Sequence, residues 1–86
     1  MFNINFAKQA QKDFNKLPRD IQCFINGKLT FYANQSNPLK WAKPLVNIPP
    51  STHRFHIRKY RAYFYISKNT IFIERIKLRG QAYKRN

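Results

Sequence analysis

The sequence predicts an α+β domain in which two helices pack on one face of a mostly antiparallel four-stranded sheet. Two patterns predict this fold. Apolar residues recur at helical spacing in residues 6–32, whereas in residues 53–76 they alternate with polar residues or form short runs. The length of 86 residues allows one small domain, 1–86, so helices and strands must share one core. The expected element order is β-α-α-β-β-β.

The first half of the chain carries a strand and two helices. Residues 2–6 alternate apolar and polar side chains, which is the period of a half-buried strand. Residues 6–17 then place apolar side chains at spacings of four, four and three, which make one stripe of a helix. Pro18 ends this helix or begins the next, because proline fits only a first turn. A second stripe spans residues 21–32, interrupted by Gly27, which costs about 1 kcal/mol relative to alanine.

Two segments are expected to be irregular. Residues 34–52 contain four of the five prolines, so we expect a connection that crosses the domain, with Trp41 as one of its core anchors. Residues 67–69 read as a turn, in which Asn69 can adopt the left-handed conformation.

The second half of the chain predicts three successive strands. Residues 53–58 alternate, and residues 60–66 are almost wholly aromatic or apolar. Residues 70–76 are apolar on both faces, which indicates a central strand. The tail, 77–86, is basic. With the helices on one sheet face, the other face is left for a basic surface with aromatic residues set into it, formed by Arg54, His56, Arg58, Arg61, Tyr63, Tyr65, Arg75, Lys77 and Arg79.

The charge of the chain predicts an anionic partner. Seventeen Lys and Arg residues face three acids, giving a formal net charge of +14 and a pI of about 10.6. Ten of the 17 bases lie in residues 51–86, so the anion-binding face should lie in the second half. A compact domain with this charge repels itself. Nucleic acid is the first candidate partner, an acidic protein the second and an anionic membrane surface the third.

Several classes of protein are excluded or disfavoured by composition. No apolar run approaches the roughly 20 residues that cross a bilayer, and no secretory signal is recognisable, so we expect a cytoplasmic protein. Cys23 is the single cysteine, which rules out an intrachain disulfide and a cysteine-based zinc site. The three scattered acids are too few for a two-metal nuclease site. We expect neither a metal nor another cofactor.

Three stretches of the sequence resemble the RelE/ParE superfamily of bacterial toxins. The first is the helix phrase FAKQAQKDFNKLP near the start, and the second is HRFHIRKYR at residues 53–61. The third is the ending IFIERIKLRGQAYKRN, in which Arg79 precedes Tyr83 by four residues and a basic pair follows. The resemblance covers nearly the whole chain.

The resemblance implies a toxin of a type II toxin–antitoxin pair. Members of the RelE branch are ribosome-dependent endoribonucleases that cut mRNA in the A site and are held inactive by a cognate antitoxin. The implied partners are therefore an acidic antitoxin, in a hetero-oligomer, and the ribosome with its mRNA, but no membrane. Carried over by position, the implied catalytic residues are His56, Arg61, Lys77, Arg79 and Tyr83. The implied RNA-binding residues are Arg54, Arg58, Lys59, Arg75, Lys84 and Arg85.

Two positions depart from the family's pattern. Relatives often have a Gly-Asp pair before the Tyr-Arg of the second-last strand, where this chain has Arg58 and Lys59. This exchange replaces a flexible acidic turn by a stiffer cationic one. His56 stands where several relatives have Lys or Arg.

The residues themselves suit metal-free RNA cleavage, in which the 2′-OH attacks the adjacent phosphate. This route needs a base, positive charge for the phosphorane and a proton for the leaving oxygen. His56 has an unperturbed pKa near 6.5, and neighbouring arginines should lower it and favour the neutral base. Arg61 and Arg79 can bind phosphate oxygens bidentately. Either His56 or a lysine could be the base.

Two other functions remain open from the sequence. A ParE-like toxin would poison a topoisomerase such as gyrase without cutting RNA, and the shared fold allows this reading. A non-catalytic basic nucleic-acid-binding protein fits the composition equally well. His56→Ala would leave such a binder functional but would disable a nuclease.

Overall fold

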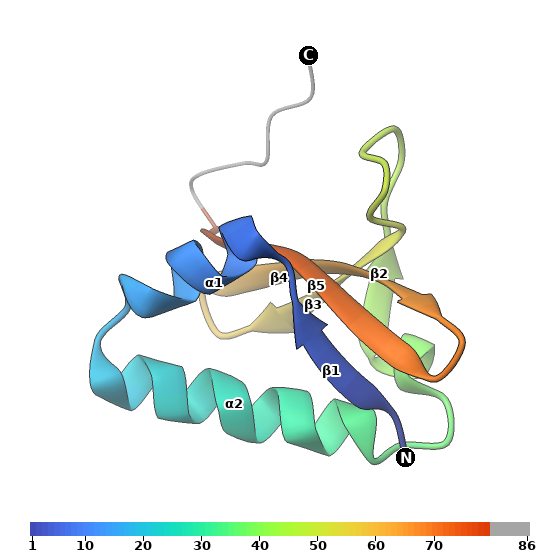
Figure 1. The fold of residues 1–86 in the computed structure, drawn as a ribbon, viewed down its shortest axis with the longest axis horizontal. Coiled ribbons are helices and arrows are strands. Elements are labelled where there is room, and N and C mark those ends of the chain that lie inside the picture. The colour runs from blue at the N-terminus through green and yellow to red at the C-terminus, as the bar shows by residue number, and fades with distance from the viewer. Residues whose placement is uncertain (80–86) are drawn as a thin grey trace.

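The computed structural model describes residues 1–79 and shows two helices packed against a five-stranded sheet (Figure 1). The elements follow in the order β1 (Asn3–Phe6), α1 (Lys8–Asn15), α2 (Arg19–Ala33), the 3-10 helix η1 (Pro38–Trp41), β2 (Ala42–Pro44), β3 (His53–Ile57), β4 (Tyr60–Ser67) and β5 (Thr70–Leu78). None of the helices in residues 1–79 is long and apolar enough to span a membrane.

The sheet has the strand order β1-β5-β4-β3-β2, with β1 parallel to β5 and the other pairs antiparallel. The predicted α+β class is confirmed, and the third predicted strand is central because β5 lies between β1 and β4. The expected count of four strands is wrong by one. Residues 42–44 of the connecting segment pair with β3 and form the short edge strand β2.

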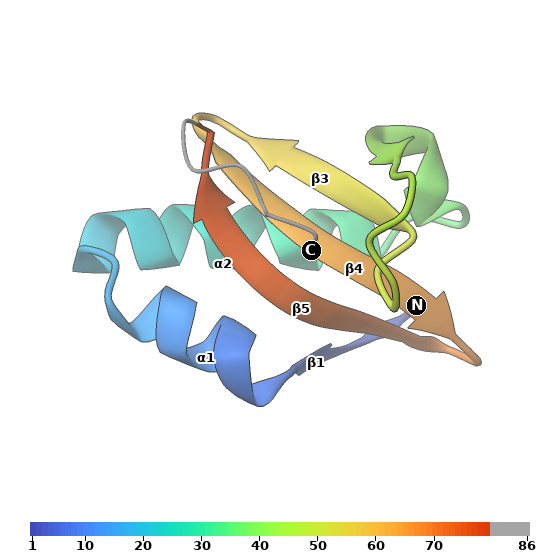
Figure 2. The ribbon, with the colours of Figure 1, turned by 90° about the horizontal axis from the view of Figure 1, so that it is seen from above.

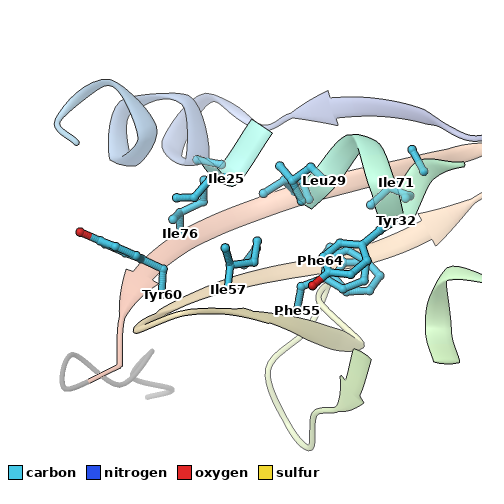
Figure 3. Close-up of a cluster of buried hydrophobic side chains, with 13 residues drawn as sticks. Ile25, Leu29, Tyr32, Phe55, Ile57, Tyr60, Phe64, Ile71 and Ile76 are labelled. Carbon is cyan, nitrogen blue, oxygen red and sulfur yellow. The ribbon is translucent and has the colours of Figure 1, made fainter. Parts of the chain in front are cut away.

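Helix α2 lies across one face of the sheet and supplies one side of the core (Figures 1 and 3). Tyr32 stacks on Phe55 with the ring centroids 4.0 Å apart, and Phe55 stacks on Phe64 at 4.1 Å. Ile25 and Leu29, from earlier turns of the same helix, are fully buried. Burying a side chain of this kind stabilises the folded state by about 1.5–3 kcal/mol, so the contacts between α2 and this face of the sheet form the stabilising core.

Helix α1 does not lie over the sheet face but beside its edge (Figure 2). β1 pairs with β5 only as far as Phe6 opposite Ile73, and the chain then turns into α1, which continues alongside β5. Pro18 is the N-cap of α2, with φ −57°, and so begins the second helix. The face of the sheet opposite α2 is therefore uncovered by either helix.

A β-bulge in β5 was not predicted. Tyr63 lies opposite Arg75, but Phe64 lies opposite Ile73, so Glu74 is an extra residue without a partner in β4. Because side chains alternate along a strand, one extra residue exchanges the faces of everything after it. Ile71 and Ile73 point towards α2 before the bulge, and Ile76 points there after it.

The apolar run of residues 70–76 is thus explained mainly by the bulge. It places Ile71, Ile73 and Ile76 on the same, buried side, although Ile73 follows Ile71 by two positions and Ile76 follows Ile73 by three. The strand also extends two residues further than expected, to Leu78.

The two tight turns of the sheet have positive φ at their first residue. Arg58 has φ 55° and Lys68 has φ 52°, as the first central residue of a type II′ turn does. The expectation that Asn69 is left-handed is therefore wrong. Asn69 instead fixes the N-terminus, because its side chain donates to the Met1 carbonyl at 2.8 Å and its carbonyl accepts from the Asn3 amide.

Trp41 is not the core anchor that the sequence suggested. Its side chain is 51% exposed and contacts Phe31 edge to face, with ring centroids 5.1 Å apart. The connection is held instead by the fully buried Pro38 and by the amide of Thr52, which donates to Phe64. The surface of α2 near Trp41 is already occupied by Phe31 and Tyr32, which leaves the indole at the rim.

Candidate functional site

A row of three basic side chains crosses the sheet on the face opposite α2. His56 of β3 lies directly opposite Arg61 of β4, and Arg61 lies directly opposite Lys77 of β5. Directly opposed residues point to the same face of a sheet. Their neighbours along the strands, such as Ile57 and Ala62, are buried on the α2 side, which fixes the row on the open side.

A second row runs beside the first, two residues along each strand. Lys43 of β2, Arg54 of β3, Tyr63 of β4 and Arg75 of β5 are consecutive register partners. Tyr63 is only 3% exposed, so its ring is packed between the charged side chains rather than standing free above them. The two rows together are called the basic face below.

The arginines of the basic face are fixed by packing. The Nε atoms of Arg54 and Arg61 are buried and have no hydrogen-bond partner among the residues that the structure describes. A buried donor without a partner costs about 1–3 kcal/mol, a cost that functional sites can carry. The planar guanidinium matches the oxygens of a phosphate. The basic face is therefore suited to a phosphate ligand.

His56 is the histidine of the basic face. Its ring is exposed, and its pKa lies below the ordinary 6.5 because of partial desolvation and then the positive charges of Arg61, Arg54, Lys43 and Arg79. A histidine with a lowered pKa is neutral near pH 7 and can accept a proton. His53 differs, because it pairs with Phe64 on the α2 side and contacts the Thr52 hydroxyl at 2.9 Å.

Asp13 supplies the carboxylate that binds Arg75. The Arg75 Nε donates to one Asp13 oxygen at 2.8 Å, and Arg75 Nη2 donates to the other at 3.2 Å. No pattern in the sequence signals the Asp13–Arg75 contact, which joins residues 62 positions apart.

The β3–β4 turn directs Arg58 away from the basic face. The guanidinium of Arg58 lies 3.8 Å from the centre of the Phe24 ring, so this side chain stacks on α2 and not on the basic face. The carbonyl of Lys59 accepts the amide of Arg79 at 2.6 Å, which brings Arg79 to the turn and near His56.

The structure therefore gathers five of the predicted residues in the two rows, with Arg79 beside them. These are Arg54, His56, Arg61, Arg75 and Lys77. Of these five, Arg75 is bound to Asp13. The predicted residues Tyr83, Lys84 and Arg85 lie outside the described residues. Lys43 was missed, because a three-residue strand ending in proline has no recognisable sequence pattern.

A pocket of about 300 Å³ opens beside Lys77, between the junction of the two helices and the ends of β4 and β5. Its lining combines apolar, aromatic, basic and acidic side chains, namely Asp13, Lys16, Leu17, Tyr60, Ile76, Lys77 and Leu78. Within residues 1–79, no group of three or more His, Cys, Asp or Glu residues is placed to hold a metal ion.

Solved structures with this fold exist, although no protein-family model and no curated protein sequence matches the chain. The RelBE2 toxin–antitoxin complex of Mycobacterium tuberculosis has a chain that is 26% identical, with a TM-score of 0.74 and 93% of each chain covered. The archaeal RelE–RelB complex of Pyrococcus horikoshii gives 20% identity and a TM-score of 0.73, covering 94% of this chain and 98% of the other.

The isolated RelE toxin of Escherichia coli is 17% identical, with a TM-score of 0.72, and the match covers 91% of this chain and 84% of that one. The similarity thus extends over nearly the whole length on both sides. The expected resemblance is confirmed in three dimensions: this chain is RelE-like, with the fold of the RelE toxins.

Proposed function

We propose that this protein is the toxin of a type II toxin–antitoxin pair and acts as a ribosome-dependent endoribonuclease that cleaves mRNA in the A site. The observation that carries the proposal is the row of His56, Arg61 and Lys77, in which a histidine with a lowered pKa lies in line with two cations on an open sheet face. The RelE-like fold supports the toxin assignment.

The proposed reaction is an in-line displacement at phosphorus. His56 accepts the proton of the 2′-OH, the 2′-oxygen forms a bond to the adjacent phosphorus, and the bond from phosphorus to the 5′-oxygen breaks. The products are a 2′,3′-cyclic phosphate and a 5′-OH. Arg61 binds the phosphate oxygens and stabilises the charge of the phosphorane. Lys77, in the same row, is an ammonium that can protonate the departing 5′-oxygen.

The requirement for the ribosome follows from the shape of the site. The basic face is a sheet surface, and the His56 ring is exposed on it. Such a surface attracts any polyanion but does not itself bend one RNA linkage into the in-line geometry that cleavage needs. We propose that the A site holds the mRNA in that geometry and that the net charge of +14 brings the toxin to the ribosome.

An acidic antitoxin is the second proposed partner. The RelE-like neighbours include toxin–antitoxin complexes. In this chain the basic face repels itself, so an acidic segment laid over it would remove both that repulsion and access to His56. We propose that the antitoxin neutralises the toxin in this way, within a hetero-oligomer.

The test is primer extension on an mRNA translated by purified ribosomes. We expect cuts inside the reading frame with the wild type, and a loss of at least about 100-fold with Arg61→Ala or His56→Ala, which is the scale of removing one catalytic group. Arg19→Ala removes the same charge from an exposed position on α2 and should cut normally. Growth arrest without cuts, together with inhibited gyrase supercoiling, would instead support the topoisomerase function.

A further inference from the structure

Within residues 1–79, no strand pairs with the edge of β5 beyond Ile73. β1 ends opposite Ile73, and the last backbone bond between the two segments runs from the Ala7 amide to the Ile73 carbonyl. The next exposed amide on that edge, that of Ile76, donates to the Asp13 carboxylate at 2.9 Å. Asp13, from α1, thus replaces the strand that is missing there.

The same carboxylate also binds Arg75, through two hydrogen bonds. The Asp13 side chain is 12% exposed and the Arg75 side chain 20%, so water competes little for these contacts. One side chain of α1 therefore holds both the backbone and a side chain of β5, immediately after the bulge at Glu74.

Because of the bulge, this attachment affects the position of the cations that follow it in β5. It interrupts the ladder between β4 and β5 and increases the local bending of the strand. Beyond it, β5 carries Lys77, the register partner of Arg61, and leads to Arg79, whose amide binds Lys59. The direction in which these two cations point depends on how the segment after the bulge is held.

We propose that Asp13 is a positioning residue that holds residues 75–79 against the bulge, so that Lys77 and Arg79 stay beside Arg61 and His56. The inference rests on the proposed function only in treating this row as the reactive one. Asp13 touches no substrate in this scheme and acts through β5.

Two variants and one matched control test the proposal on the intact protein by NMR. Asp13→Ala removes both acceptor oxygens, whereas Asp13→Asn retains one acceptor and should keep the fold if the alanine variant loses it. Asp20→Asn removes the same charge from an exposed position in the first turn of α2. We expect the Ile76 amide to exchange with solvent about tenfold faster in the Asp13 variants, while amides of the β1–β5 ladder keep their rates.

The titration of His56 provides the readout that a purely structural ion pair would leave unchanged. The charged groups nearest its ring are Lys43 of β2, Arg54 of β3, Arg61 of β4 and Arg79 after β5, while Lys77 of β5 lies on the far side of Arg61. If residues 75–79 are released, Arg79 moves away and the pKa of His56 rises towards 6.5. Simply deleting a negative charge would lower that pKa, so the sign separates the two causes.

A folded Asp13→Ala variant with an unchanged or lowered His56 pKa would overturn the proposal, as would an equal rise in Asp20→Asn. An Asp13→Asn variant in which the Ile76 amide exchanges faster but the His56 pKa does not rise would overturn it as well. Neither measurement involves RNA cleavage, so failure of the proposed nuclease activity would leave this test intact.

Discussion

Lys77 lies directly opposite Arg61 only because Glu74 is an extra residue in β5. If Glu74 were instead paired with Tyr63 in a regular strand, alternation would point Arg75 and Lys77 at α2 and turn Ile76 and Leu78 outwards. The buried core and the basic face therefore depend on the same irregularity.

Deleting Glu74 should leave both faces of β5 in place. Arg75 then follows Ile73 directly, so Ile76 still points at α2 and Lys77 still lies opposite Arg61, now in a regular strand. Glu74→Ala keeps the residue count and is the matched control, with an expected change within about 0.5 kcal/mol. Urea denaturation followed by circular dichroism measures both. Loss of the cooperative transition in the deletion variant would contradict the assignment of Glu74 as the extra residue.

Gly27→Ala should stabilise the protein by about 1 kcal/mol. Gly27 lies inside α2 with ordinary helical backbone, and a Cβ built there meets no atom within 4 Å. The gain therefore comes from helix propensity without a steric cost. The midpoint of chemical denaturation checks it, and a lower midpoint than in the wild type would show that the site is not open.

Stability should fall in acid through Asp13. Burial alone would raise its pKa, but the bonds from Arg75 and Ile76 and the charges of Arg75 and Lys77 outweigh burial and hold the pKa below 3.8. A lowered folded pKa stabilises the native state above the unfolded value, and this contribution is lost as the pH falls through the folded value. The window is therefore below about pH 4.

Asp13→Asn should lose about 1–3 kcal/mol at pH 7 and much less near pH 2. Urea denaturation across this pH range measures the difference, with Asp20→Asn as the control that should lose about 1 kcal/mol or less. An equal loss for Asp13→Asn at both pH values would mean that the carboxylate charge contributes nothing.

The pH dependence of cleavage should follow His56. If neutral His56 is the base, the single-turnover rate rises with pH and reaches half its plateau below pH 6.5. Desolvation and the charges of Arg61 and Arg54 set that midpoint, so Arg54→Gln should move it upwards. Lys8→Gln, on the exposed side of α1, should leave it in place. A midpoint well above 7 would point to a lysine as the base.

Much of the fold was predictable because it rests on local periodicity. The alternation in residues 53–58 and the stripe in residues 21–32 identify β3 and α2 without knowledge of the partner elements. The rows of the basic face follow from the same alternation once the β3–β4 turn is fixed as a two-residue turn. His56 and Arg61 could therefore be placed together from the sequence.

The remaining features depend on contacts that periodicity does not record. The bulge at Glu74 exchanges which alternate residues face α2, within a strand that looks continuous in the sequence. β2 is too short to show a pattern. Arg58 was expected at the site by position, but the nearby Phe24 ring offers it a cation–π contact. Asp13 reaches Arg75 from an element far away in the sequence. Each of these is decided by the packing of distant segments.

The proposed nuclease activity is tested by inducing the protein in bacteria and mapping mRNA ends. The comparison is between the wild type, Arg61→Ala and the charge-matched Arg19→Ala. We expect growth arrest with cuts inside reading frames for the wild type and Arg19→Ala, and neither effect for Arg61→Ala. Growth arrest with intact mRNA, or unchanged cutting by Arg61→Ala, would contradict a nuclease centred on the basic face.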